Sequence, residues 1–201
     1  MTETESIYGG RLPEMRALME LIEAQVSALR AEMLAETGMD PVEHFLCRIK
    51  SEASMREKCR RQGLPETPES ALEVIHDAVG LRIVCAFLND VYRIRDHLAA
   101  IPGLKILSEK DYIRNAKPNG YRSYHMIVQA GGGLSAEIQL RTISMDTWAA
   151  LEHHLKYKKT VPGNAALIVA ELKRCAEELA STDVSMQTLR DMILEGRETA
   201  P

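Results

Sequence analysis

Three strand-like runs separated by strong turn sequences constrain the fold of this chain more than any other feature. Residues 104–113, 121–130 and 134–142 are rich in aliphatic and aromatic side chains and predict three strands. The turn at 118–120 reads Pro-Asn-Gly, in which Pro presets φ and Asn and Gly tolerate positive φ. Three glycines at 131–133 predict a hairpin between the last two strands. The runs therefore predict one sheet.

Helical patterns flank these strands. Pro13 in a first-turn position and helically spaced leucines predict a helix over residues 12–36, which Gly38 ends. Asp40 as N-cap, followed by Pro and an acidic first turn, predicts a second helix that runs to about Gln62. The other predicted elements are a short helix at 69–76, a β-rich run at 79–88, a helix at 90–100 capped by Asn89-Asp90, a helix at 143–158, a break at 162–164 and a last helix at 165–194. Helices, then a mixed sheet, then helices give an α+β fold, predicted as one domain over residues 1–201.

Composition excludes several classes of protein. The chain has 201 residues, 45% of them hydrophobic, which is enough for one ordinary core. A formal net charge of -4 argues against a general nucleic-acid coat, which would need a basic excess. No apolar run approaches the ~18 residues that span a membrane, and the acidic start is not typical of a signal peptide. Four cysteines without a Cys-x-x-Cys pair predict reduced thiols in a cytoplasmic protein.

The residues around the Pro-Asn-Gly turn predict a nucleotide site. Lys110, Lys117 and Arg122 bring positive charge to the turn, and Tyr121 and His125 lie beside them in the sequence. Cations gathered at a tight turn suit a polyphosphate, and a tyrosine ring offers a flat face to a base.

A second basic segment lies on the predicted second helix. Lys50, Ser54 and Lys58 are four residues apart, which places them on one helix face. Such a face is most often only solvated. The shortage of acidic residues beside it favours a ligand instead.

Two carboxylates are candidates for a metal site. Asp77 lies where a helix meets a strand, either as a helix-end residue or as a ligand at the open end of the sheet. Glu137, Gln139 and Arg141 alternate along one strand, so they share a face that is either solvated or lines a pocket. Mg²⁺ takes one or two carboxylates together with phosphate oxygens, so Asp77 and Glu137 form a plausible pair.

Histidine patterns suggest other chemistry but find little support. His76-Asp77 is typical of metal-dependent phosphohydrolases, yet the remaining histidines do not supply the ligands that such a helical bundle needs. His153 and His154 diverge by ~100° on a helix, so they do not face one metal. Trp148 is interpreted as a core residue.

Six segments in register resemble the synthetase domain of the RelA/SpoT family. They are residues 48–58, 77–84, 110–113, 117–125, 137–142 and 145–153. Each is weak alone, but together they are specific and cover roughly residues 40–160. Without a hydrolase half, the chain resembles a stand-alone small alarmone synthetase. The resemblance implies a nucleotidyltransferase-like fold with extra terminal helices, which in small members of the family mediate oligomers.

The resemblance also implies an activity. Pyrophosphate would move from ATP to the 3′-hydroxyl of GDP or GTP, giving ppGpp or pppGpp and AMP, and GMP stays open as a further acceptor. Asp77 and Glu137 would be catalytic and hold Mg²⁺, and Glu137 would draw the proton from the 3′-hydroxyl. ATP is assigned to Arg48, Lys50, Ser54, Lys58 and Arg82. The acceptor is assigned to Lys110, Lys117, Asn119, Tyr121, His125, Gln139, Arg141 and Asp146.

Several of these roles match the chemistry of the side chains. Arg48 and Arg82 would sandwich the adenine through their planar guanidinium groups. Tyr121 would stack on guanine. Asp146 would accept two parallel bonds from guanine N1–H and N2–H₂.

Partners and alternatives follow from the same features. The apolar positions of the last helix predict a homo-oligomer, and the resemblance implies a tetramer. An alternative function is a catalytically weak relative that binds (p)ppGpp or single-stranded RNA as a regulator. Intact Asp77, Glu137 and Tyr121 argue against that alternative, as does the acidic net charge.

Overall fold

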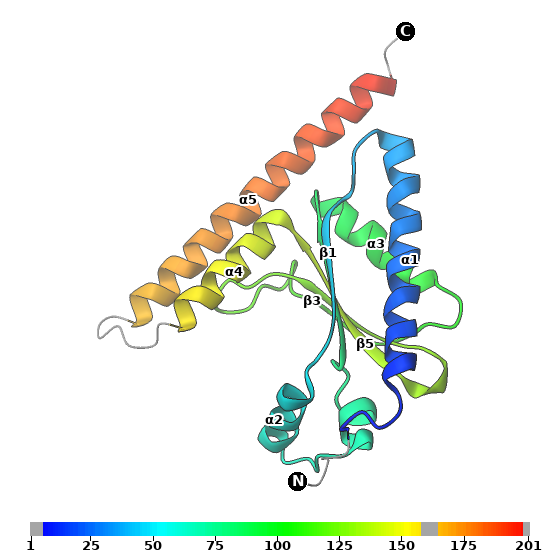
Figure 1. The fold of residues 1–201 in the computed structure, drawn as a ribbon. Coiled ribbons are helices and arrows are strands. Elements are labelled where there is room, and N and C mark those ends of the chain that lie inside the picture. The colour runs from blue at the N-terminus through cyan, green and yellow to red at the C-terminus, as the bar shows by residue number, and fades with distance from the viewer. Residues whose placement is uncertain (1–5, 158–164, 199–201) are drawn as a thin grey trace.

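A mixed sheet with helices around it forms the centre of the molecule (Figure 1). The structure is a computed structural model that describes residues 6–157 and 165–198. Within these residues the sheet has five strands in the order β1-β2-β5-β4-β3, of which only β2 and β5 pair in parallel. The strands are β1 (Val42–Ile49), β2 (Val79–Cys85), β3 (Lys105–Asp111), β4 (Tyr124–Gln129) and β5 (Ser135–Thr142). The expected α+β class is confirmed.

The helices cover the sheet unequally. They are α1 (Leu12–Thr37), α2 (Glu52–Gln62), α3 (Leu88–Ala100), α4 (Ile143–Tyr157) and α5 (Ala165–Glu198), with a short π-helical turn at Ser70–Val74. Helices α1 and α3 contact each other and pack on one face of the sheet (Figure 1). On the other side, α4 and α5 lie side by side, and α2 stands apart at the end of β1.

The core lies between the sheet and helices α1 and α3. Helix α1 buries a stripe that includes Ile22 and Met33, and α3 buries Ile94. Strand β5 contributes Ile138 and Leu140, which are fully buried. Because successive strand residues point to opposite faces, the residues between them face away from this core. The alternation predicted for 134–142 is therefore confirmed.

The predicted second helix is wrong over its first half, because residues 42–49 form strand β1. Asp40 does act as a local cap: its Oδ1 accepts the Val42 N–H at 3.0 Å, and its carboxylate pairs with Arg30. The same capping chemistry can precede a turn into a strand, and antiparallel pairing with β2 decides the outcome. The helix proper starts after Ser51, whose Oγ accepts the Ser54 N–H, and Gly63 with φ 69° ends it.

Two further helix predictions change in detail. Helix α3 begins at Leu88, so Asp90 lies in its first turn, where its Oδ2 accepts the Phe87 N–H at 3.2 Å. Helix α5 turns polar residues inward: Asp183, Gln187 and Arg190 are buried. The predicted break at 162–164 lies outside the described residues. In the part of the chain that the structure describes, no helix is both long and apolar enough to cross a membrane.

Candidate active site

The predicted site residues form a grid on the sheet face opposite the core. One row crosses all the strands of the described sheet, because Lys110 pairs with His125, His125 with Gln139, Gln139 with Arg82, and Arg82 with Leu46. Cross-strand partners project to the same side of a sheet. The register therefore brings acceptor and donor candidates into one line, although they come from distant parts of the sequence.

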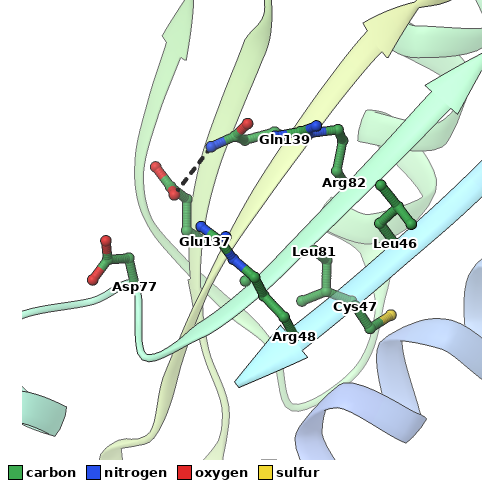
Figure 2. A pocket seen from close by; sticks show the side chains of 9 residues that line it. Leu46, Cys47, Arg48, Asp77, Leu81, Arg82, Glu137 and Gln139 are labelled. Atoms are coloured by element: carbon green, nitrogen blue, oxygen red, sulfur yellow. Dashed lines mark hydrogen bonds between the residues drawn. The ribbon is translucent and has the colours of Figure 1, made fainter. Parts of the chain in front are cut away.

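A cavity of about 310 Å³ opens on this face beside that row (Figure 2). Gly80 forms part of its lining and pairs with Arg48 on one side and Glu137 on the other. Because Gly80 has no side chain, no side chain fills the cavity between Arg48 and Glu137. The lining residues are Leu46, Cys47, Arg48, Asp77, Gly80, Leu81, Arg82, Glu137 and Gln139.

Two lysines converge on Asp77 at one end of the cavity. Lys50 Nζ and Lys58 Nζ both donate to Asp77 Oδ2, at 2.8 and 2.6 Å. Lys50 directly follows β1 and Lys58 lies on α2, so the turn between these elements sets the geometry. Burial alone would raise the pKa of Asp77, but the two ammonium groups outweigh it and hold that pKa below its ordinary value. Asp77 is therefore ionised at neutral pH.

The second carboxylate lies in the middle of the sheet. Glu137 Oε2 accepts a bond from Gln139 Nε2 at 3.2 Å, and Glu137 Oε1 lies 3.4 Å from His125 Nδ1. The contact with His125 lowers the pKa of Glu137 despite its burial. Glu137 is therefore ionised at neutral pH.

Asp77 and Glu137 fit a divalent ion that is completed by substrate. Asp77 Oδ1 is buried, and none of the described residues donates a hydrogen bond to it. Both carboxylates line the same cavity (Figure 2). The described residues contain no group of three or more His, Cys, Asp or Glu side chains placed to bind a metal. Mg²⁺ suits such a site, because it is commonly held by one or two carboxylates plus phosphate oxygens.

The aromatic cluster around Tyr121 lies on the other side of Glu137. Tyr121 Oη lies 2.9 Å from His125 Nε2 and accepts a bond from Arg141 Nη2 at 2.8 Å. The ammonium of Lys117 lies over both the Tyr121 ring and the Tyr112 ring, at 4.8 and 4.6 Å from their centroids. The cluster thus gathers cations against flat rings.

The turn that carries Tyr121 is braced from two sides. Asn119 Oδ1 accepts the Tyr121 N–H at 3.2 Å, and Asn119 Nδ2 donates to Glu152 on α4 at 3.3 Å. Gly120 adopts φ 93° and lies against Ala176 of α5. The Pro-Asn-Gly turn predicted from the sequence is present, and Asn119 supports it.

Asp146 connects the two halves of the site. Its Oδ1 accepts a bond from Arg141 Nη1 at 2.9 Å and lies 3.4 Å from Arg82 Nη1. His44 Nε2 is 3.7 Å from Asp146 Oδ2. Asp146 lies in the first turn of α4, where Thr142 Oγ1 accepts the Met145 N–H. Arg82, which lines the cavity, is therefore also a neighbour of the acceptor candidate Asp146.

The structure brings most of the predicted site residues together, with two at the margins. Lys110 and Ser54 are exposed, Lys110 at the end of the cross-sheet row and Ser54 in the first turn of α2. Trp148 is buried, and its Nε1 donates to the Leu172 carbonyl, as expected of a core residue.

Three neighbours of the site were missed in the sequence. Leu46 and His44 lie two and four residues before Arg48 on β1, and a strand assignment there would have placed them on one face. Tyr112 packs edge-on against His125 and Tyr121. Its position beside Lys110 and Asp111 was a signal that could have included it.

Known proteins are similar to this chain in sequence. The family described as "Region found in RelA / SpoT proteins" matches residues 47–161. GTP pyrophosphokinase YwaC of Bacillus subtilis (strain 168) is 39% identical over 168 residues, which are 79% of this chain and 79% of YwaC. The chain therefore belongs to the RelA/SpoT family.

Solved structures place it beside the small alarmone synthetases. The crystal structure of small alarmone synthetase 1 from Bacillus subtilis bound to its product pppGpp matches with a TM-score of 0.75 and 31% identity, over 91% of this chain and 95% of that chain. The same synthetase bound to AMPCPP matches with a TM-score of 0.69 and 29% identity, over 92% and 96% of the two chains. Similarity therefore extends over nearly the whole length of both proteins.

Proposed function

We propose that this protein transfers pyrophosphate from ATP to the 3′-hydroxyl of GDP or GTP, which yields ppGpp or pppGpp and AMP. The observation that carries the proposal is the cross-sheet row, which places a cation-lined cavity and an aromatic, cation-rich cluster on either side of strand β5, the strand that carries Glu137 and Gln139. Relatives of similar length named as GTP pyrophosphokinases, and a relative bound to pppGpp, support it.

ATP is assigned to the cavity. Arg48 and Arg82 would hold the adenine between their guanidinium planes, since they lie on neighbouring strands at the cavity wall. Lys50 and Lys58 would exchange part of their contact with Asp77 for the phosphates, and Ser54 lies on the same helix end. Binding of AMPCPP, an ATP analogue, by a relative is consistent with such a donor site.

The guanine nucleotide is assigned to the aromatic cluster. Tyr121 would stack on the base, and Asp146 would accept the bonds of guanine N1–H and N2–H₂. Lys110, Lys117 and His125 would face the acceptor phosphates, and Asn119, Gln139 and Arg141 would hold this arrangement. Because Asp146 is bound to Arg141 without ligand, guanine would compete for an occupied carboxylate.

The proposed reaction forms one bond to phosphorus and breaks another. The 3′-oxygen of the acceptor bonds to the β-phosphorus of ATP, the bond from that phosphorus to the α,β-bridging oxygen breaks, and AMP leaves with the oxygen. Glu137 would receive the proton of the 3′-hydroxyl. Asp77 and Glu137 would hold Mg²⁺, which when bound neutralises charge on the donor phosphates. Positioning and charge neutralisation carry most of the rate.

Product analysis tests the activity directly. The protein is incubated with ATP, Mg²⁺ and each of GMP, GDP and GTP, and the products are resolved by anion exchange. We expect AMP together with a guanine nucleotide that carries a 3′-pyrophosphate. Breakdown of added ppGpp without any synthesis would instead favour a hydrolase, and binding without either reaction would favour a regulator.

We also propose a homo-oligomer, with a tetramer as the expected form. The outward side of α5 carries Leu167, Ile168, Val184, Leu189 and Ile193, all at least 44% exposed. Its inward side is apolar around Ala176 and polar at Asp183, Gln187 and Arg190, and packing within the chain leaves the outward apolar residues uncovered. Light scattering should give a multiple of the 22.5 kDa chain mass, and a mass near 22.5 kDa at micromolar concentration refutes the proposal.

A further inference from the structure

The irregular segment before the first helix is deeply buried. Ile7 and Tyr8 are each 1% exposed, although they precede α1 and belong to no strand or helix. Irregular segments of a protein usually run over its surface and are exposed. Figure 1 shows this segment at the same end of the molecule as α2, to which Ser6 is hydrogen-bonded through Glu52.

Its hydrogen bonds reach one particular turn. Tyr8 Oη donates to the carbonyl oxygen of Lys50 at 2.6 Å. Ser6 Oγ donates to Glu52 Oε1 at 2.7 Å, and the Ile7 N–H donates to Glu52 Oε2 at 3.3 Å. Lys50 lies in the turn between β1 and α2, and Glu52 is the first residue of α2, so the segment holds both sides of this turn from outside.

That turn presents the two lysines of the cavity. The Lys50 backbone is held on both sides, because its carbonyl accepts from Tyr8 and its N–H donates to the Ala78 carbonyl at 2.8 Å. From there the Lys50 side chain reaches Asp77, and α2 delivers Lys58 to the same oxygen atom. A displacement of the Lys50 backbone would therefore move both cations relative to the carboxylate.

The phenol of Tyr8 is suited to a permanent role as donor. Burial, and after it the negative charge of Asp77, raises the pKa of Tyr8 to about 12. Its hydroxyl therefore keeps its proton at neutral pH.

We infer that Tyr8 is a positioning residue for the donor end of the site. It fixes the Lys50 backbone so that Lys50 and Lys58 meet the triphosphate in register with Asp77. This role rests on the proposed assignment of ATP to the cavity. A group that is held in place before binding loses less entropy when the ligand arrives, so loosening it weakens binding at that end alone.

The test is Tyr8→Phe, which removes the hydroxyl and keeps the ring. Binding of AMPCPP and of GDP is measured separately by calorimetry, and KM for ATP and for GDP is measured by turnover. We expect a roughly three- to tenfold weaker Kd for AMPCPP and a similar rise in the KM for ATP. The Kd and the KM for GDP should stay within about twofold of wild type.

Tyr124→Phe is the matched control. Tyr124 is 8% exposed, and its hydroxyl donates to Glu109 at 3.1 Å, on the face of the sheet that packs against α3. Both variants lose one partly buried phenol bond, so both should melt at a slightly lower temperature. A merely structural role for Tyr8 predicts that the two variants bind the nucleotides alike.

The outcomes separate this inference from the proposed activity. Equal weakening of AMPCPP and GDP by Tyr8→Phe, or no weakening of either, overturns the role of Tyr8. If Tyr8→Phe does not fold, Ser6→Ala is tested in its place. We expect Ser6→Ala to bind AMPCPP with about a twofold weaker Kd. An unchanged Kd would overturn the inference. A wild type that binds AMPCPP but forms no product counts against pyrophosphate transfer only, because the binding comparison still decides the role of Tyr8.

Discussion

The two ends of the proposed site differ in how their charged groups are satisfied before any nucleotide arrives. At the donor end, Arg48 and Arg82 line an open cavity, and Asp77 is paired with the ammonium groups of Lys50 and Lys58. At the acceptor end, Tyr121, His125, Arg141 and Asp146 bind one another. ATP would fill a space that exists, whereas the guanine nucleotide would exchange its contacts for internal ones.

This difference predicts different consequences of mutation at the two ends. A substitution in the cavity removes a contact with the donor and leaves the neighbouring side chains largely as they are. A substitution in the acceptor cluster removes a contact with the ligand and also releases the partners of the lost side chain. Arg82 joins the two ends, since it lines the cavity and lies 3.4 Å from Asp146.

The largest effect is expected at the boundary, where Asp77 and Glu137 would share Mg²⁺. Asp77→Asn or Glu137→Gln keeps the shape of each side chain and removes its charge. Synthesis of ppGpp should fall at least ~10³-fold, because the donor phosphates lose the ion that neutralises the leaving AMP. EDTA should abolish wild-type activity, and Mg²⁺ or Mn²⁺ should restore it.

A folding measurement and a third variant serve as controls for these two substitutions. Circular dichroism should show a folded chain for both, and Glu109→Gln, a carboxylate outside the cavity, should retain most of the activity. If Glu137→Gln keeps near wild-type synthesis, Glu137 is neither a metal ligand nor the proton acceptor. The boundary between the two ends would then lie elsewhere.

The acceptor end is tested next by Tyr121→Ala. Stacking of a base on an aromatic ring contributes about 1–3 kcal/mol, so the KM for GDP should rise about five- to 150-fold. The KM for ATP should change far less, because the Tyr121 ring does not line the cavity. Initial rates with one nucleotide varied at a time measure both constants. Equal increases in the two constants would show that Tyr121 supports the fold rather than the base.

Much of the site was predictable because its residues sit in local patterns. Glu137, Gln139 and Arg141 alternate with core residues on β5, and a two-residue period alone places them together. The Pro-Asn-Gly turn fixes its own backbone, so the loop that carries Tyr121 could be assigned without knowledge of the rest of the chain.

The sequence-based predictions were wrong or incomplete where contacts between distant parts of the chain determine the local structure. Asp40 and Pro41 signal a helix start as well as a turn, and only pairing with β2 selects the strand. The second half of the inward side of α5 is polar because Arg190 meets the buried carboxylate of Asp90 at 2.6 Å, and Asp183 meets Thr142. Tyr8 was overlooked for the same reason, since its partner Lys50 is 42 residues away. Hydrophobic periodicity contains no information about such pairs.

A smaller and more local effect is expected from Gly120→Ala. This substitution should displace the Pro-Asn-Gly turn at residues 118–120 without removing a contact with the ligand. Gly120 has φ 93°, and an added Cβ would lie 2.6 Å from the Ala176 Cβ on α5. The turn must then move away from α5, so we expect about a tenfold higher KM for GDP and a loss of about 1–3 kcal/mol in the free energy of unfolding.

Gly103→Ala is a control that separates the effect of backbone strain at positive φ from the effect of displacing the turn at residues 118–120. Gly103 has φ 84°, but an added Cβ would meet nothing within 4 Å. This control should lose stability through backbone strain alone and keep the KM for GDP. If both variants raise that KM alike, contact between the turn and α5 does not position the acceptor.

The smallest effects are expected from two ion pairs that support the strands at either end. Glu109 on β3, next to Lys110, accepts bonds from Arg95 at 2.7 and 2.6 Å, which lower the pKa of Glu109 below its ordinary value of 4.5. Asp40, which precedes β1, has its pKa lowered in the same way by Arg30. A lowered folded-state pKa means that each pair stabilises the protein above the ordinary pKa of its carboxyl group. This contribution is lost as the pH falls through the folded-state pKa.

Glu109→Gln should therefore lower the free energy of unfolding by about 1 kcal/mol at pH 7, and Asp40→Asn by only about 0.3 kcal/mol. The difference arises because the Asp40 and Arg30 side chains are 40% and 41% exposed, whereas Glu109 and Arg95 are 24% and 28% exposed, so water screens the first pair more. Urea unfolding at pH 7 and near pH 3 measures both variants. Each deficit should shrink at the lower pH, because the wild-type carboxyl groups then take up protons. A deficit for Glu109→Gln that stays constant with pH would mean that packing, and not charge, holds β3 and its Lys110 at the acceptor end.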